Sequence, residues 1–271
     1  SREIDYYVGP KKYSLLRDLG KKTSEDKGKQ CDKIMEFGFW EVVCIPLLWI
    51  MNAINCVVPN YGVVIILLTI LIRLVFWPVM QKSAENSKKM QALQPQLAAL
   101  KEQYKDDQPQ YLKKQQELFK ENKVSVLGGC LPMLIQLPVL FSLFVVLRSS
   151  VELRGATFLW IRDLSEPERL FAGILPFWPH HLNILPILMT VVQIFQMKIT
   201  PTPGDQQMQK MMLIFMPLFM LYLLYDMASG LVLYWTVSQF LAIVQILLTN
   251  RKDLKKGNKT SGPVLVPVRK K

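Results

Sequence analysis

The chain has 271 residues, of which 51% are hydrophobic, and its 33 lysines and arginines outnumber its 21 acidic residues. A basic excess of this kind fits a nucleic-acid-binding protein, but long uncharged apolar runs argue against that class and against a soluble helical bundle. These runs lie at 61–72, 129–147, 182–197, 211–225 and 227–250. The sequence therefore predicts an all-α polytopic membrane protein.

Metal and catalytic motifs are missing from the sequence. The four cysteines show no C-x-x-C spacing, and the only two histidines are the neighbours His180 and His181, which argues against a structural zinc site. The sequence has no H-E-x-x-H motif and no phosphate-binding loop. We therefore predict no metal site, no cofactor, no catalytic residue and no enzymatic activity.

The first elements in chain order differ in character. Residues 1–33 open with "SREIDYYVGPKKY", which is typical of a strand end before a Gly-Pro turn and resembles the remnant of a preceding domain, followed by a linker. Segment 34–57 is long enough to span a membrane, but its glutamates, asparagines, proline and two tryptophans favour an amphipathic helix at the interface. The "PNYG" turn then leads into the first predicted transmembrane helix, 61–80.

Segment 81–128 carries nine lysines and six acidic residues and predicts a helical hairpin. Its first helix shows an apolar stripe at three- and four-residue spacing, and Pro109 is well placed to begin the second helix. The stripe comprises Met90, Leu93, Leu97, Leu100 and Tyr104. The lysines are consistent either with a solvated face or with contacts to anionic lipid headgroups or ribosomal RNA.

Four further transmembrane helices are predicted within 129–250, at about 129–151, 182–199, 209–226 and 230–250. The basic tail 251–271 has eight lysines and arginines against one aspartate, which predicts a disordered arm. Positive charge marks the cytoplasmic side, so the hairpin, the 198–210 link and the tail are predicted to be cytoplasmic. Residues 1–60, 152–184 and the 226–230 turn are then predicted to lie outside.

Polar side chains interrupt the predicted spans, and Arg73 is the most costly of them. An arginine at the centre of a membrane helix costs at least about 2.5–3.5 kcal/mol, and no carboxylate lies within the spans to neutralise it. Thr69 shares a helix face with Arg73. Single polar residues of this kind often join helices to one another, but together with Arg73 they suggest a hydrated cavity open to the cytoplasm. The other predicted site residues are Gln136, Gln193, Gln196, Trp235, Ser238 and Gln239, and Ser142 and Gln245 are further polar residues inside the spans.

Six stretches of the chain, covering roughly residues 34–256 in order, resemble the YidC/Oxa/Alb family of membrane protein insertases, most closely its bacterial branch. They include "YGVVIILLTILIRLVFWP" (61–78), "NKVSVLGGCLPMLIQLPVLFSLFVVL" (122–147) and "SGLVLYWTVSQFLAIVQ" (229–245). The resemblance implies a bacterial inner-membrane protein with five transmembrane helices around a hydrophilic groove, a cytoplasmic hairpin and an external amphipathic helix over 34–57. It also implies that the end of a large periplasmic domain lies at 5–13.

The resemblance also implies residue roles and partners. Arg73 falls on the family's groove arginine, Thr69 and Trp235 fall on substrate-contacting positions, and Gln193 and Gln196 lie near a groove glutamine. The implied activity is insertion and folding of nascent membrane proteins, alone or with the Sec translocon. The implied partners are therefore nascent membrane proteins, membrane lipids, the ribosome and the translocon, but no DNA. The longer, aromatic stretch 166–183 departs from the family pattern and has no functional explanation.

Two other functions remain alternatives. A secondary transporter or channel would use Arg73 as an anion site, although the sequence shows no inverted repeat or broken helix of the kind common in transporters. A scaffold would use the hairpin to recruit soluble partners.

The charge of the tail gives a first prediction. If residues 251–271 hold ribosomes electrostatically, co-sedimentation of the protein with ribosomes should fall steeply with added salt. Removing 251–271 should lower binding at low salt and flatten this dependence. A truncated protein that binds as tightly at every salt concentration would exclude a ribosomal role for the tail.

Overall fold

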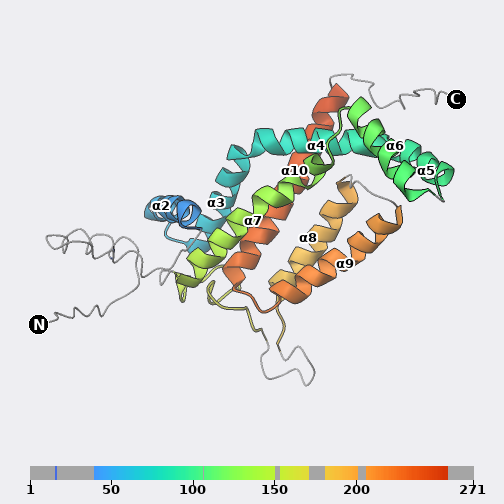
Figure 1. Cartoon of the computed structure of the whole chain (residues 1–271). Coiled ribbons are helices and arrows are strands. Elements are labelled where there is room, and N and C mark those ends of the chain that lie inside the picture. The colour runs from blue at the N-terminus through green and yellow to red at the C-terminus, as the bar shows by residue number, and fades with distance from the viewer. Residues whose placement is uncertain are drawn as a thin grey trace, which may run out of the picture. The chain divides into compact units, whose positions relative to one another are not determined.

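The computed structural model of the chain describes Leu16 and residues 40–105, 107–149, 153–170, 181–200 and 206–255 (Figure 1). Apart from Leu16, the predicted domain remnant and linker at 1–33 lie outside the described residues, as does the tail from residue 256 onward. The described residues are helical, with short irregular connections and no strand. The predicted all-α class is therefore confirmed for this part of the chain.

Nine described helices follow one another along the chain (Figure 1). They are α2 (Glu41–Val57), α3 (Tyr61–Val75), α4 (Trp77–Ala92), α5 (Gln94–Gln103), α6 (Gln108–Glu121), α7 (Val126–Ser149), α8 (Ile184–Ile199), α9 (Gln206–Leu224) and α10 (Ser229–Lys255). The helix α10 continues five residues into the predicted tail, since no glycine or proline interrupts it before Gly257 and basic residues favour a helix C-terminus. The prediction that disorder begins at 251 is therefore wrong for 251–255.

The single helix predicted over 61–80 is instead two helices. The helix α3 ends at Val75, and α4 leaves it at an angle of 65° after Phe76. Pro78 lies in the first turn of α4. It has no N–H to donate to the carbonyl of Leu74, and its ring would clash with that carbonyl in a continuous helix. The bend therefore follows from the proline at the end of the apolar run.

Length and composition alone mark one described helix as able to cross a membrane, Ser229–Thr249 of α10, or two if the bent pair α3 and α4 is a single span. The other apolar helical segments are shorter, at Glu41–Val57, Leu134–Leu147, Ile184–Ile199 and Met211–Leu224. A bilayer core of about 30 Å needs roughly 20 helical residues. Five transmembrane helices therefore remain a prediction.

The chain forms two compact units. The first contains residues 1–69, 136–186 and 224–235, and the second contains 70–135, 187–223 and 236–271. Four helices (α3, α7, α8 and α10) contribute one end to each unit, and α9 contributes only its last residue, Leu224, to the first.

In the first unit, α2 has a buried face and an exposed face that are both apolar. Cys44, Leu47, Leu48 and Met51 are buried at three- and four-residue spacing. The thiol of Cys44 donates to the carbonyl of Ser142 in α7 over 3.6 Å, and Trp40 stacks on Phe141 with ring centroids 5.7 Å apart. Val42, Trp49 and Val57 are exposed. The two apolar faces depart from a simple amphipathic pattern, which has one apolar face.

Glycines allow two close approaches in this unit. Gly62, in the first turn of α3, lies against the ring of Phe158, so that a Cβ at this position would overlap the ring. Gly230, at the start of α10, donates its N–H to the carbonyl of Leu164 over 2.8 Å. A side chain at Gly230 would meet that carbonyl at 3.0 Å. The connection between α7 and α8 is thus packed against the ends of α3 and α10.

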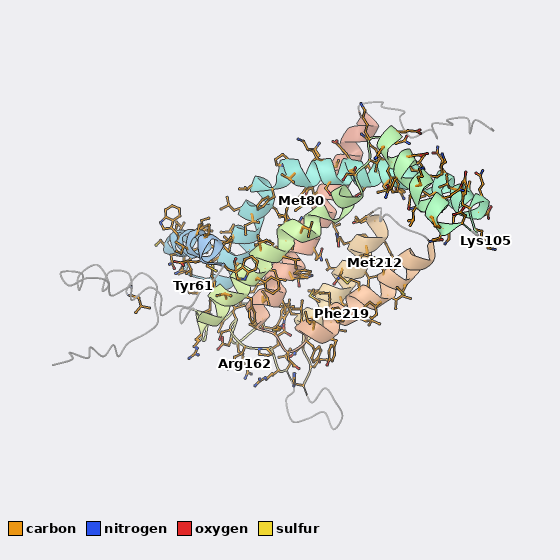
Figure 2. All side chains as sticks on the ribbon, viewed as in Figure 1. Tyr61, Met80, Lys105, Arg162, Met212 and Phe219 are labelled. Atoms are coloured by element: carbon orange, nitrogen blue, oxygen red, sulfur yellow. The ribbon has the colours of Figure 1, made fainter. Side chains whose placement is uncertain are left out.

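In the second unit, α4, α5 and α6 correspond to the predicted hairpin. The helix breaks at Leu93, and Asp107 caps α6 by accepting the N–H of Gln110 over 3.1 Å, with proline in the first turn as predicted. Lys105 lies in the link between α5 and α6 (Figure 2). Only the start of the predicted apolar stripe is buried, since α5 has no buried residue. A small core comprises Met90, Leu93 and Val124, with Phe119 packed against it.

The base of this hairpin is closed by a reciprocal pair of hydrogen bonds. The side-chain amide of Asn86 in α4 donates to the carbonyl of Ser125 over 2.7 Å. The N–H of Ser125 donates back to Oδ1 of Asn86 over 3.0 Å. The two ends of the hairpin therefore meet immediately before α7 begins.

The contact between Gly62 and Phe158 gives a second prediction. Gly62→Ala should destabilise the protein by about 1–3 kcal/mol, because an overpacked contact forces the ring or the backbone to shift. In the Phe158→Ala background the same substitution should cost much less. Thermal unfolding of the four proteins in detergent measures the coupling, and equal losses in both backgrounds would contradict the contact.

Candidate functional site

Arg73 lies in the last turn of α3 and is bound to α10 within the second unit. Its Nη2 donates to the carbonyl oxygen of Ser238 over 2.7 Å and to the Ser238 hydroxyl over 2.9 Å. The arginine is half-buried and Ser238 is 4% exposed. Hydrogen bonds to a charged donor are about twice as strong as neutral ones. A neutral residue of a neighbouring helix therefore supplies acceptors for a cation that has no carboxylate in its own span.

Several polar side chains, Ser238 among them, are buried in this unit. They lie on α4 (Ser83, Ser87), α8 (Thr190, Gln193) and α10 (Thr236, Ser238, Gln245, Thr249). The Oε1 of Gln193 and the Nε2 of Gln245 are buried and make no hydrogen bond within the described part of the chain. An unsatisfied buried amide costs about 1–3 kcal/mol. Such groups are satisfied when water or a polar ligand reaches them.

Three of the predicted site residues belong to the first unit. Thr69 is 1% exposed, and its hydroxyl donates to the Ile65 carbonyl of its own helix over 2.6 Å. The side-chain amide of Gln136 in α7 donates to the Tyr234 hydroxyl in α10 over 2.6 Å. Trp235 is half-buried, and its indole N–H is buried with no acceptor among the described residues. Gln136 therefore joins two helices, whereas Thr69 is satisfied locally.

Of the eight predicted site residues, the structure joins Arg73 directly to Ser238. Gln193 is buried in the same unit. Gln196 and Gln239 are half-buried, and the backbone carbonyl of Gln196 accepts the hydroxyl of Thr200 over 2.7 Å. Thr69, Gln136 and Trp235 lie in the other unit. Sequence reasoning missed Tyr234, the partner of Gln136, which is 1% exposed. The sequence feature that could have revealed Tyr234 is its position beside Trp235, in a predicted span that polar residues interrupt.

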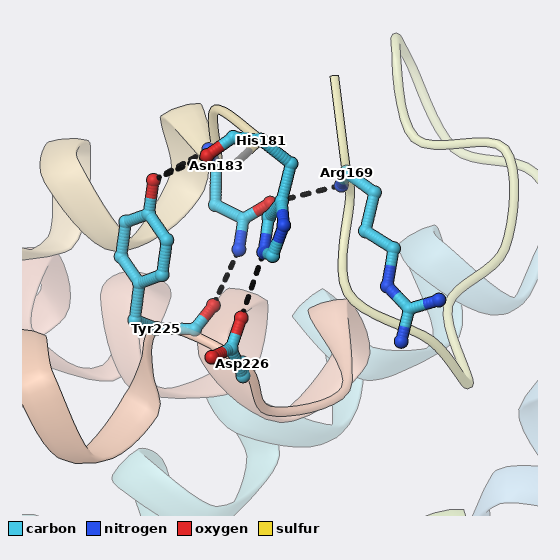
Figure 3. A network of polar contacts seen from close by, with 5 residues as sticks. All are labelled: Arg169, His181, Asn183, Tyr225 and Asp226. Atoms are coloured by element: carbon cyan, nitrogen blue, oxygen red, sulfur yellow. Dashed lines mark hydrogen bonds and ion pairs between the residues drawn. The ribbon is translucent and has the colours of Figure 1, made fainter. Parts of the chain in front are cut away.

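A second polar network, absent from the predictions, joins the start of α8 to the end of α9 (Figure 3). Asn183 is central to it: its Oδ1 accepts the N–H of Arg169 over 2.8 Å, and its Nδ2 donates to the Tyr225 carbonyl over 2.5 Å. The Tyr225 hydroxyl donates to the His181 carbonyl over 2.9 Å, and His181 Nε2 lies 2.8 Å from Asp226 Oδ1. The network closes the connection before α8 against the turn after α9.

Glu168 supports the same connection by capping α8. Its carboxylate accepts the N–H groups of Ile184, over 2.6 Å, and Leu185, over 3.1 Å. It also accepts the indole N–H of Trp160 over 3.0 Å. A carboxylate is favourable at a helix N-terminus because the N–H groups there carry partial positive charge. No group of three or more metal-binding side chains occurs among the described residues.

Asp163 is a further acidic group of this connection whose charge is held internally. Burial raises the pKa of its carboxyl group. Hydrogen bonds from the hydroxyl and N–H of Ser165, over 2.7 and 2.8 Å, and from the N–H of Gly155, together with the charge of Arg154, outweigh burial, so the pKa lies below its usual range. The stabilisation is therefore present at neutral pH and is lost as the pH falls through the lowered pKa.

Comparison with known proteins identifies the family. The model of the 60Kd inner membrane protein family matches residues 53–256. The chain belongs to this family. It is 40% identical over 246 residues to the membrane protein insertase YidC of Pelobacter propionicus, and 41% identical over 265 residues to that of Beijerinckia indica. These alignments cover 90% and 92% of this chain but 44% and 43% of the relatives.

A solved structure agrees with the family. An active YidC insertase crystal structure with its first transmembrane domain resolved matches with a TM-score of 0.61 and 26% identity. The match covers 89% of this chain and 53% of that one. The chain thus spans about half the length of the relatives that it matches, and these relatives are named as insertases and not as enzymes.

The bond between Arg73 and Ser238 gives a third prediction. Ser238→Ala removes one acceptor, so it should lower the free energy of unfolding by about 1.5–3 kcal/mol, the range of a hydrogen bond to a charged group. In an Arg73→Met background, which keeps most of the side-chain volume, the loss should nearly vanish. The measurement is thermal unfolding of the four proteins in one detergent.

Thr249→Ala is the matched control for this cycle. Thr249 is another buried hydroxyl of α10, and it bonds to the Gln245 carbonyl of its own helix over 2.9 Å. Its effect should add to that of Arg73→Met, because well-separated sites are independent. Additivity for Ser238→Ala as well would show that the hydroxyl does not bind the arginine.

Proposed function

We propose that the chain is the membrane-embedded part of an insertase that inserts and folds nascent membrane proteins in the bacterial inner membrane. The observation that carries the proposal is the half-buried cation of Arg73, held on Ser238 in a unit whose described residues include eight buried polar side chains. Membership of the 60Kd inner membrane protein family and the names of its relatives support it.

Insertion needs a polar route for the hydrophilic flank of a substrate beside an apolar route for its membrane-spanning segment. The hydrophilic flank of a substrate must cross the bilayer while its apolar segment enters lipid, and transferring the flank through hydrocarbon is costly because its polar groups lose water. In our proposal Arg73, Gln193, Gln196, Ser238 and Gln239 line a hydrated groove in the second unit, and Thr69, Gln136 and Trp235 of the first unit are further substrate contacts. Water in this groove shortens the apolar barrier, and the arginine attracts acidic or partly negative flanks.

The apolar path is assigned to α9. Its outward residues recur at three- and four-residue spacing, with Met211, Ile214, Phe215, Leu218 and Tyr222 between 56% and 72% exposed. Phe215 and Phe219 stack with ring centroids 5.8 Å apart. A flexible, methionine-rich surface of this kind adapts to different apolar partners. We assign it contact with lipid and with the apolar segments of substrates.

The proposal includes an orientation and partners. The hairpin and the C-terminus are cytoplasmic, and α2 and the connection 153–170 are external, in agreement with the distribution of basic residues. Ribosomes and the Sec translocon are proposed as partners through the hairpin and the tail. No cofactor is needed, because insertion is driven by transfer of apolar segments into lipid.

The fourth prediction concerns the charge at Arg73. Both contacts to Ser238 come from a single nitrogen, so the ammonium of a lysine, which has three donors, can replace them. Arg73→Lys should keep most insertion activity, whereas Arg73→Ala and Arg73→Glu should impair it, Glu most. The loss should be greatest for substrates whose translocated flanks contain Asp or Glu. Protease protection of translocated flanks, in cells depleted of their own insertase, measures the effect.

Protein abundance must be equal in this comparison, because removal of a buried cation also changes folding. An inactive Lys variant at normal abundance, or equal losses for charged and uncharged flanks, would contradict the electrostatic role. Liposomes that contain the purified protein should show no solute flux dependent on Arg73. Such a flux would favour a transporter or channel instead.

A further inference from the structure

Residues 158–161 form a tight turn in the connection after α7. Phe158 and Ile161 exchange both backbone hydrogen bonds, over 2.9 and 2.8 Å, which leaves Leu159 and Trp160 as a two-residue tip. Ile161 is 2% exposed, and the ring of Phe158 lies against Gly62 of α3. The two residues at the base of the tip are therefore fixed by the first unit.

The tip itself is unusual in both conformation and composition. Leu159 has a φ of 52° and is 76% exposed, and Trp160 is 41% exposed. Turns of two residues with positive φ favour Asn, Asp or Gly. A bulky residue in this region is a rare outlier that costs roughly 1–2 kcal/mol. Leu159 thus combines a strained backbone with an exposed apolar side chain, and little contact within the chain offsets the strain.

The depth of the tip follows from its base. Gly62 belongs to the first turn of α3 and immediately precedes the uncharged apolar run that ends before Arg73. Because Phe158 touches Gly62, the neighbouring Leu159 lies near the level at which α3 enters the bilayer. This is the headgroup region, where tryptophan is enriched because its ring is apolar and its N–H is polar. The N–H of Trp160 already has an acceptor in Glu168, which fixes the ring.

The charges around the tip also favour the headgroup region of the bilayer. Arg162 directly follows the turn 158–161 and is exposed (Figure 2). Two acidic groups of the connection are engaged internally, since Asp163 accepts hydrogen bonds from Ser165 and Glu168 accepts them from the start of α8. A guanidinium that is free to reach outward suits lipid phosphates, which it binds through two parallel hydrogen bonds.

We propose that Leu159 and Trp160 insert into the boundary between headgroups and acyl chains of the bilayer, with Arg162 contacting phospholipid phosphates. The tip then anchors the connection between α7 and α8 to the membrane surface at the end where α3 begins. The inference depends on the placement of the chain in a membrane, which is part of the proposed function, and not on insertion activity.

The test places an environment-sensitive fluorophore at single cysteines after the four native cysteines are replaced. Three labelled variants are compared in nanodiscs of phosphatidylethanolamine and phosphatidylglycerol: Leu159→Cys, Glu166→Cys as a solvent-exposed control in the same connection, and Phe240→Cys on the exposed face of α10. Nitroxide lipids labelled near the headgroup should quench the label at 159 at least threefold more than the label at 166. Aqueous iodide should show the opposite order.

The control at Phe240 separates failure of the membrane anchor from failure of the membrane placement of the whole chain. If the label at 240 is quenched by nitroxide lipids while the label at 159 responds only to iodide, the tip lies in water or on a soluble protein, and the anchor is wrong. If neither label is quenched by lipid, the membrane placement also fails.

A second variant tests whether Leu159 serves internal packing instead. Asparagine accepts positive φ readily, so Leu159→Asn should melt in detergent at the wild-type temperature or above. A fall of several degrees would show that Leu159 contributes to packing within the chain and would overturn the anchor.

Discussion

A permanent cation within an apolar helix needs hydrogen-bond acceptors from the residues that pack around it. The guanidinium of Arg73 loses water when α3 is buried, so neighbouring groups must supply acceptors. Ser238 supplies two of them, one of which is a helix carbonyl whose second lone pair remains available beside its helical bond. This interaction fixes the last turn of α3 on α10. The chain bends three residues later, where Pro78 prevents a straight continuation.

The polar groups of the second unit extend this constraint. Gln193 and Gln245 are too buried to be ordinary surface residues, yet one polar atom of each has no partner among the described residues. An apolar residue at either position would avoid this cost. In the proposed function, water or the polar flank of a substrate satisfies these two atoms. The outward side of α9 is by contrast continuously apolar, so one unit offers a polar and an apolar environment.

Much of this could be predicted from the sequence because apolar runs and charge blocks are local signals. The ends of α7, α8 and α9 lie within three residues of the predicted spans, and the need for a partner for Arg73 followed from the cost of burying its charge. The partner of Arg73 could not be predicted, since 165 residues separate it from Ser238. The 65° bend was also missed, because apolarity continues through Phe76 and Trp77 whereas the effect of Pro78 on the backbone is steric. The network around Asn183 was not predicted, because its members are residue types that are common in loops. Only the folded chain brings the two turns that carry them together.

The closure at Asn86 and Ser125 makes the hairpin an insertion in topological terms. The chain leaves and returns at two hydrogen-bonded positions separated by 39 residues. Because the ends of the hairpin already meet, changing its length alters the entropic free-energy cost of loop closure only slowly, by roughly 0.6 kcal/mol for each doubling of length. Evolution can therefore vary its size and surface without shifting the helices that carry Arg73. The part of the chain best suited to acquiring new contacts with other molecules is therefore the part whose alteration least disturbs the helices around Arg73.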